Sequence, residues 1–165
     1  MFQDMNKFIV TNIIILSLVL GIILGLLAPT PYVGAIMLFV ALLLAAPLVI
    51  VYLIMDGKFD LTTTKDSIIT GALIGFCVNL TFSGTYCILI AILAKGFQYT
   101  TNFFLTAMVT NSPIWLIALF IIFIGVLCAT TNAFSGFMTY YIINLIRDIY
   151  EKQHPELKND RNYKE

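Results

Sequence analysis

Charged side chains are scarce in this sequence, and their scarcity excludes an ordinary water-soluble fold. Only 11% of the 165 residues are charged and 60% are hydrophobic, whereas soluble domains average about 25% and about 45–50%. A chain with this composition cannot cover its apolar surface in water. The formal net charge is zero, so no overall field attracts nucleic acid. The composition predicts an integral membrane protein whose principal partner is the lipid bilayer.

Residues that bind metals or act as nucleophiles are also few. The one histidine, His154, lies in a hydrophilic segment, and the three cysteines lack the paired spacing of a zinc or redox site. Free cysteines in apolar segments behave as small buried hydrophobic residues. The sequence contains no phosphate-binding glycine loop and no nucleophile elbow. We therefore expect no enzymatic activity, no metal and no other cofactor.

Four apolar segments reach the length of about 20 residues that a membrane-spanning helix needs. They cover residues 8–28, 31–55, 67–94 and 113–133. None contains Asp, Glu, Lys, Arg or His, the residues that mark proton relays and ion coupling inside membranes. The sequence predicts an all-α integral membrane protein built as a four-transmembrane-helix bundle.

Residues 134–153 carry a second kind of pattern. Apolar residues recur at helical spacing from Phe134 to Ile149, while Ser135, Thr139 and Asn144 fall on another face. The pattern predicts an amphipathic interfacial helix, continuous with the fourth span or kinked away from it, with its polar face toward water. Residues 154–165, which begin at His154 and Pro155, are expected to be a disordered polar tail.

The basic residues predict the orientation. With four spans, eight of the nine Lys and Arg residues share one side with both termini: Lys7, Lys58, Lys65, Arg147, Lys152, Lys158, Arg161 and Lys164. Lys95 lies on the other side. Because an excess of Lys and Arg marks the cytoplasmic face, both termini are expected inside. A fifth span over residues 134–149 would violate this rule. Ile-, Asn- and Tyr-rich usage favours a bacterial inner (plasma) membrane.

The third predicted span contains the densest group of neutral polar residues within the apolar segments. Its members are Asn79, Thr81, Ser83, Thr85 and Tyr86. An amide in hydrocarbon seeks hydrogen-bond partners on a neighbouring helix. The favoured interpretation is a clasp between helices, and the alternative is a contact for a substrate or an ion.

Small residues and prolines indicate how the spans pack and bend. Ser17, Gly21 and Gly25 in the first span share a four-residue spacing with Gly71 and Gly75 in the third. Such rows let helices approach closely, so the two spans are expected to be neighbours, or the first row to form a homodimer face. Pro47 is expected to kink the second span. Thr30 and Ser112, each followed by proline, are expected helix N-caps.

The segment Gly96–Asn111 is long for a helix connection and rich in aromatic residues. It is interpreted as an interfacial belt, with a lid over a cavity as the alternative. The sequence leaves two candidate functions. The first is a structural or accessory membrane subunit, in a homo-oligomer or with a membrane partner protein. The alternative is a small transporter or channel component with a neutral polar pathway around Asn79.

Overall fold

The computed structural model describes residues 7–30, 32–56 and 63–153, and within these ranges every regular element is a helix. The elements are α1 (Lys7–Leu27), α2 (Val33–Phe39), the π-helix η1 (Val40–Leu44), α3 (Ala45–Met55), α4 (Thr64–Phe97), α5 (Phe103–Asn111) and α6 (Ile114–Gln153). Four helical segments of the described chain are long and apolar enough to cross a membrane: α1, the α2–η1–α3 rod, α4 and α6. The predicted all-helical architecture with four such segments is confirmed. The expected polar tail, residues 154–165, lies outside the described residues.

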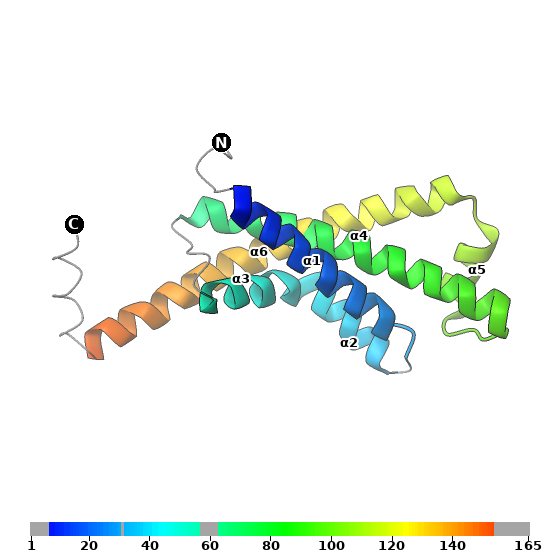
Figure 1. The fold of residues 1–165 in the computed structure, drawn as a ribbon, viewed down its shortest axis with the longest axis horizontal. Helices are drawn as coiled ribbons and strands as arrows, with labels where there is room; N and C mark the ends of the chain where they lie inside the picture. The colour runs from blue at the N-terminus through cyan, green and yellow to red at the C-terminus, as the bar shows by residue number, and fades with distance from the viewer. Residues whose placement is uncertain (1–6, 31, 57–62, 154–165) are drawn as a thin grey trace.

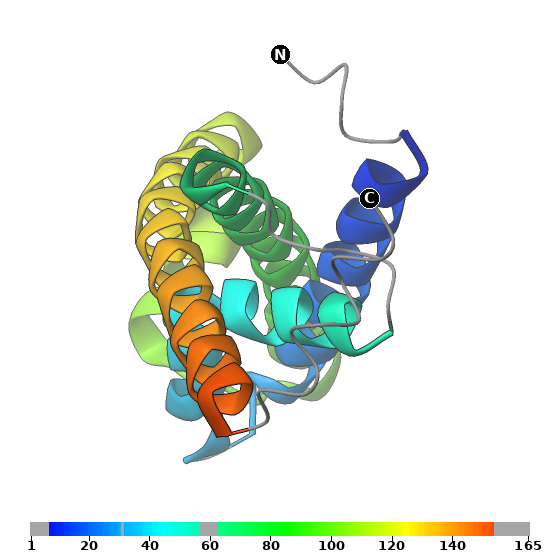
Figure 2. The same cartoon turned by 90° about the vertical axis from the view of Figure 1, so that its left-hand side faces the viewer.

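α4 is the central helix of the bundle. It lies between α1 and α6, and the α2–η1–α3 rod covers a further side (Figures 1 and 2). The start of α1, the end of α3, the start of α4 and the end of α6 share one end of the molecule, which we call the basic end because it carries Lys7, Lys65, Arg147 and Lys152. The opposite end, with Lys95, the α1–α2 connection and α5, is called the α5 end.

Glycines allow α4 to approach both of its long neighbours. A Cβ atom built on Gly25 of α1 would lie 2.8 Å from the Phe82 carbonyl oxygen of α4, and one on Gly75 of α4 would lie 2.5 Å from the Asn132 Cβ of α6. Neither distance leaves room for a side chain. α1 and α4 are therefore neighbours, but their small-residue rows do not face each other, because Gly71 and Gly75 pack against α6.

A compact apolar core lies among α1, α3 and α4. Its fully buried side chains include Ile13, Ile50, Leu53, Ile74 and Val78. Ser17 of the small-residue row is also buried, and its hydroxyl donates to the Ile13 carbonyl oxygen of its own helix at 2.7 Å. This bond satisfies the hydroxyl within α1, so Ser17 fills space in the core without needing a partner on another helix.

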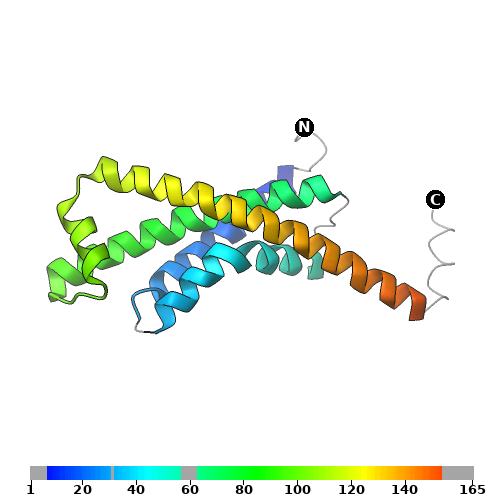
Figure 3. The same cartoon turned by 180° about the vertical axis from the view of Figure 1, so that it is seen from behind.

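α6 is one continuous helix of 40 residues, about 60 Å long at 1.5 Å per residue. Its contact with α4 extends past the predicted end of the fourth span, since the Ser67 hydroxyl donates to the Gly136 carbonyl oxygen at 2.5 Å. Ser135 and Thr139 are buried. The expectation that this polar face points to water is wrong for these two residues, because this part of α6 packs into the bundle, with Gly136 against Ser67 and Gly71 of α4. The last turns of α6 project beyond the other helices (Figure 3).

The helix ends differ from the predicted caps. The Thr30 hydroxyl donates to the Leu27 carbonyl oxygen of the preceding helix, and α2 begins after Tyr32 without a side-chain cap. Ser112 ends α5. The side-chain caps among the described helix starts are Thr63, which accepts from the Asp66 N–H at 3.1 Å, and Asn102, which accepts from the Leu105 N–H at 3.2 Å. The Thr30 hydroxyl thus bonds back to a carbonyl of the preceding turn instead of capping the next helix.

Candidate functional site

The second span is bent near its middle. Pro47 is the third residue of α3 and follows the five-residue π-helix η1. Proline lacks an N–H group and its ring crowds the preceding turn, and π-helical turns interrupt the regular backbone bonds. Both features occur together at the bend between α2 and α3 (Figure 3). Backbone groups released at such a bend need partners elsewhere when no water is present.

Asn132 of α6 supplies those partners. Its Oδ1 accepts from the Ala46 N–H at 2.8 Å, and its Nδ2 donates to the carbonyl oxygens of Leu42 at 2.9 Å and Ala41 at 3.2 Å. The neighbouring Thr131 hydroxyl also donates to the Leu42 oxygen, at 2.7 Å. The amide carries both donors and an acceptor, so one side chain satisfies both kinds of backbone group. Asn132 is fully buried.

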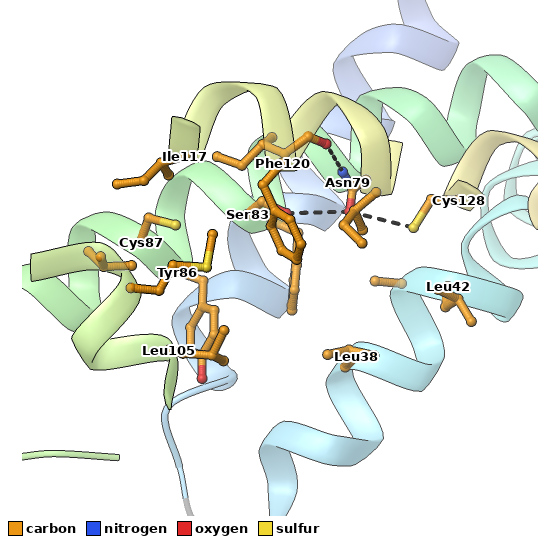
Figure 4. A pocket seen from close by; sticks show the side chains of 16 residues that line it. Leu38, Leu42, Asn79, Ser83, Tyr86, Cys87, Leu105, Ile117, Phe120 and Cys128 are labelled. Carbon is orange, nitrogen blue, oxygen red and sulfur yellow. Dashed lines mark hydrogen bonds between the residues drawn. The ribbon is translucent and has the colours of Figure 1, made fainter. Parts of the chain in front are cut away.

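Asn79 forms a second connection between helices. Its Nδ2 donates to the Ile121 carbonyl oxygen of α6 at 3.2 Å. Its Oδ1 accepts from the Ser83 hydroxyl at 3.3 Å and lies 3.5 Å from the Cys128 sulfur (Figure 4). Asn79 is 3% exposed. The side chain thus ties α4 to α6 through its amide nitrogen.

The predicted polar cluster is divided between two faces of α4. Asn79, Ser83 and Tyr86 stand at i, i+4 and i+7, and all three line a cavity beside α6. Thr81 and Thr85 point the other way, toward Gly21 and Gly25 of α1. The Thr81 hydroxyl donates to the Cys77 carbonyl oxygen of its own helix at 3.0 Å. The five residues therefore do not form one continuous polar surface.

The cavity beside Asn79 has a volume of about 320 Å³, the lower end of the range for small-molecule sites. Its walls come from α2, η1, α4, α5 and α6 (Figure 4). Aliphatic and aromatic side chains predominate, Leu38, Leu105 and Phe120 among them, and no charged side chain lines it among the described residues. The site offers apolar contact with little free hydrogen-bonding capacity. We call it the inner chamber.

The segment 96–111 contributes the wall at the α5 end. α4 terminates at Gln98, whose left-handed backbone (φ 53°) turns the chain toward α5. Leu105, Met108 and Val109 line the inner chamber, while Phe103 and Phe104 are largely exposed. The short helix α5 thus lines a cavity with some side chains and leaves two aromatic rings exposed. The interfacial belt and the lid both stay predictions.

A second cavity of about 380 Å³ adjoins the first at the α5 end. The two share the lining residues Leu38, Phe82, Tyr86 and Leu105. The second, which we call the outer chamber, is more polar: its lining adds neutral hydrogen-bonding side chains, namely Thr30, Tyr32, Tyr99, Thr101 and Asn102. It too has no charged lining residue within the described chain.

The chemistry available at these sites is neutral. No group of three or more His, Cys, Asp or Glu side chains is placed to hold a metal ion in the part of the chain that the structure describes. Asn132 is the important residue that sequence analysis missed. The sequence did contain an indication, because Asn132 stands at the end of an apolar run and its amide needs hydrogen-bond partners as much as that of Asn79 does. No family model, curated protein or solved structure matches this sequence.

Proposed function

We propose that this chain is a non-catalytic structural or accessory subunit of a bacterial inner (plasma) membrane. The main support for the proposal is the hydrogen bonding of two buried side-chain amides. Asn79 and Asn132 both bond neighbouring helices, which holds the bundle together instead of leaving polar groups free for a substrate. Large apolar side chains such as Phe123 and Leu119 remain exposed, as suits contact with lipid or with a partner subunit.

The proposed topology places the basic end in the cytoplasm and the α5 end outside. Its support is the placement of Lys7, Lys65, Arg147 and Lys152 at one end and Lys95 at the other. Single cysteines in a background without native cysteines test it. An impermeant thiol reagent applied to intact cells should label Thr100→Cys and leave Asp160→Cys protected. The reverse labelling pattern would contradict this orientation.

We also propose that the end of α6 rests on the cytoplasmic leaflet as an amphipathic helix. Support comes from its length, because about 60 Å of helix exceeds the ~30 Å hydrocarbon thickness. Tyr141, Leu145 and Ile149 form an exposed apolar stripe, and Arg147 and Lys152 suit anionic headgroups. Spin labels over residues 141–153 should alternate between lipid and water with a period of about 3.6 residues. Uniform bilayer-depth burial would contradict the interfacial placement.

The accessory role is tested by crosslinking in cells. A photoreactive amino acid at the exposed position Phe123 should form one discrete adduct with a membrane partner or with a second copy of this chain. The same group at the buried position Val78 is the matched control and should react only within the chain. Diffuse products at Phe123, with no discrete adduct, would indicate lipid contact alone and would contradict a subunit role.

A transporter or channel component is the second candidate, and the inner chamber beside Asn79 is the observation that favours it. The chamber's apolar walls and the orientation of Thr81 and Thr85 toward α1 disfavour a polar pathway. Solute flux into proteoliposomes separates the two proposals. If Asn79→Leu abolishes a measured flux without changing thermal stability or oligomeric state, the transporter proposal replaces the accessory one.

A further inference from the structure

The inner chamber is apolar, like the acyl chain of a lipid, and the outer chamber is more polar, like a lipid head. The inner chamber presents hydrocarbon and aromatic walls. Its most polar group, the Asn79 amide, is already bonded to Ile121 and Ser83. A polar ligand buried there would lose its bonds to water and find few replacements. An apolar chain would give up no hydrogen bonds and would exchange its contacts with lipid for contacts with the walls.

The outer chamber offers hydrogen bonds without charge. The hydroxyls of Tyr99 and Thr101 belong to its lining, and the Asn102 amide keeps its N–H groups there although its oxygen accepts from the Leu105 N–H. The Thr30 hydroxyl also lines it but already donates to the Leu27 carbonyl oxygen. Lys95, the basic residue of this end, is not part of it. An anionic headgroup would therefore enter without a counter-charge, whereas hydroxyl or ester groups would find matching neutral partners.

The position of the inner chamber provides access from the membrane. Leu38 of α2 and Phe120 of α6 both line it and remain 51% and 42% exposed. The chamber is therefore bordered by exposed apolar side chains of these two helices. A molecule dissolved in the bilayer reaches the chamber sideways, without passing through water.

We infer that the two chambers bind a lipid with an uncharged, hydrogen-bonding head, with one acyl chain in the inner chamber and the head in the outer chamber. Monoacylglycerol represents this class. The shared residues Phe82 and Tyr86 lie where the chain joins the head. α5 closes the site toward the outside through Leu105 and Met108, so the acyl chain is shielded from water.

The test uses the full chain in phosphatidylcholine nanodiscs and a monoacylglycerol with a diazirine in its acyl chain. Photolysis should label peptides containing residues 79–87 and 105–109, and unlabelled monoacylglycerol should compete. Lysophosphatidic acid with the same diazirine chain should label these peptides about tenfold less, since its head is charged. Equal capture of both probes would overturn the uncharged-head assignment.

Matched variants locate the ligand. Cys87→Phe adds a ring inside the inner chamber and should reduce labelling about tenfold, while Ile88→Phe adds the same ring on the exposed side and should leave it unchanged. Val109→Phe fills the chamber from α5 and serves if Cys87→Phe does not fold. Labelling that is insensitive to a folded filling variant, or that spreads evenly to outward residues without competition, would overturn the proposal in favour of ordinary lipid contact.

Discussion

The two halves of the α4–α6 contact contrast sharply, although the same pair of helices forms both. Toward the basic end the backbones nearly touch, because Gly71, Gly75 and Gly136 present no side chains; a Cβ on Gly136 would lie 2.8 Å from the Ser67 carbonyl oxygen. Toward the α5 end, large residues such as Tyr86 and Phe120 line a cavity of about 320 Å³. Small residues let the two helices close in one half, and large side chains hold them apart in the other.

We call the part of the α4–α6 contact toward the basic end the closed half. The largest loss of stability is expected from a substitution that forces the two helices apart there. Gly75→Val places a branched side chain where the Cβ alone meets Asn132 and the Cys128 carbonyl oxygen at 2.5 Å. The free energy of unfolding should fall by about 3 kcal/mol or more, since the backbones must separate. Thermal unfolding of the purified chain in detergent measures this loss.

Gly84 provides the control on the same helix. Nothing lies within 4 Å of a Cβ built there, so Gly84→Ala should raise stability by about 0.5–1 kcal/mol through its effect on helix propensity. If both glycine variants changed stability equally, close packing would not distinguish the two positions.

Asn132→Leu should have the next largest effect. It removes the side-chain bonds to the Ala46 N–H and the Ala41 carbonyl oxygen at the bend, while the Leu42 oxygen keeps its bond from Thr131. A loss of about 2 kcal/mol is expected, because orphaned backbone groups are costly away from water. Hydrogen exchange should also accelerate at Ala46. Unchanged exchange at this amide would show that Asn132 does not support the bend.

Asn79→Leu should cost less, about 0.6–1.7 kcal/mol, the usual range for hydrogen bonds between membrane helices. Asn79 bonds one carbonyl oxygen of α6 that already belongs to a regular helix. It also borders the inner chamber, where leucine finds space. Thermal unfolding of the two leucine variants under identical detergent conditions measures the difference. A larger loss of stability for Asn79→Leu than for Asn132→Leu would contradict the proposed order.

The smallest effect is expected at Thr70, whose hydroxyl is fully buried in the closed half without a hydrogen-bond partner. Thr70→Val keeps the shape and removes the orphaned group, so stability should stay unchanged or rise by up to about 1 kcal/mol. Thr131→Val is the matched control, because it removes the bond to the Leu42 carbonyl oxygen. It should lower stability by about 0.5–1.5 kcal/mol, as measured by thermal unfolding.

The parts of the site that sequence analysis anticipated depend on local composition. Asn79 and the glycines of α1 and α4 stand out because polar or small residues in a long apolar run have few roles. The bend at Pro47 was anticipated for the same reason, since proline acts on its own helix. Asn132 also stands in an apolar run and could have been singled out, but its role at the bend could not be predicted, because its partners Ala41, Leu42 and Ala46 lie about 90 positions away in the chain.

Composition and periodicity alone determined that the described chain contains four long apolar helical segments, with charged residues confined to their ends and connections. Those properties depend on each segment's own length and hydrophobicity, so no knowledge of neighbours is required. Only the tertiary structure decided that Gly71 and Gly75 face α6, that Thr81 faces α1 while Asn79 faces α6, and that α5 lines a cavity. Each of these depends on the rotation and crossing of the helices. Because the helices are all similarly apolar, a few contacts of small and polar residues decide that arrangement.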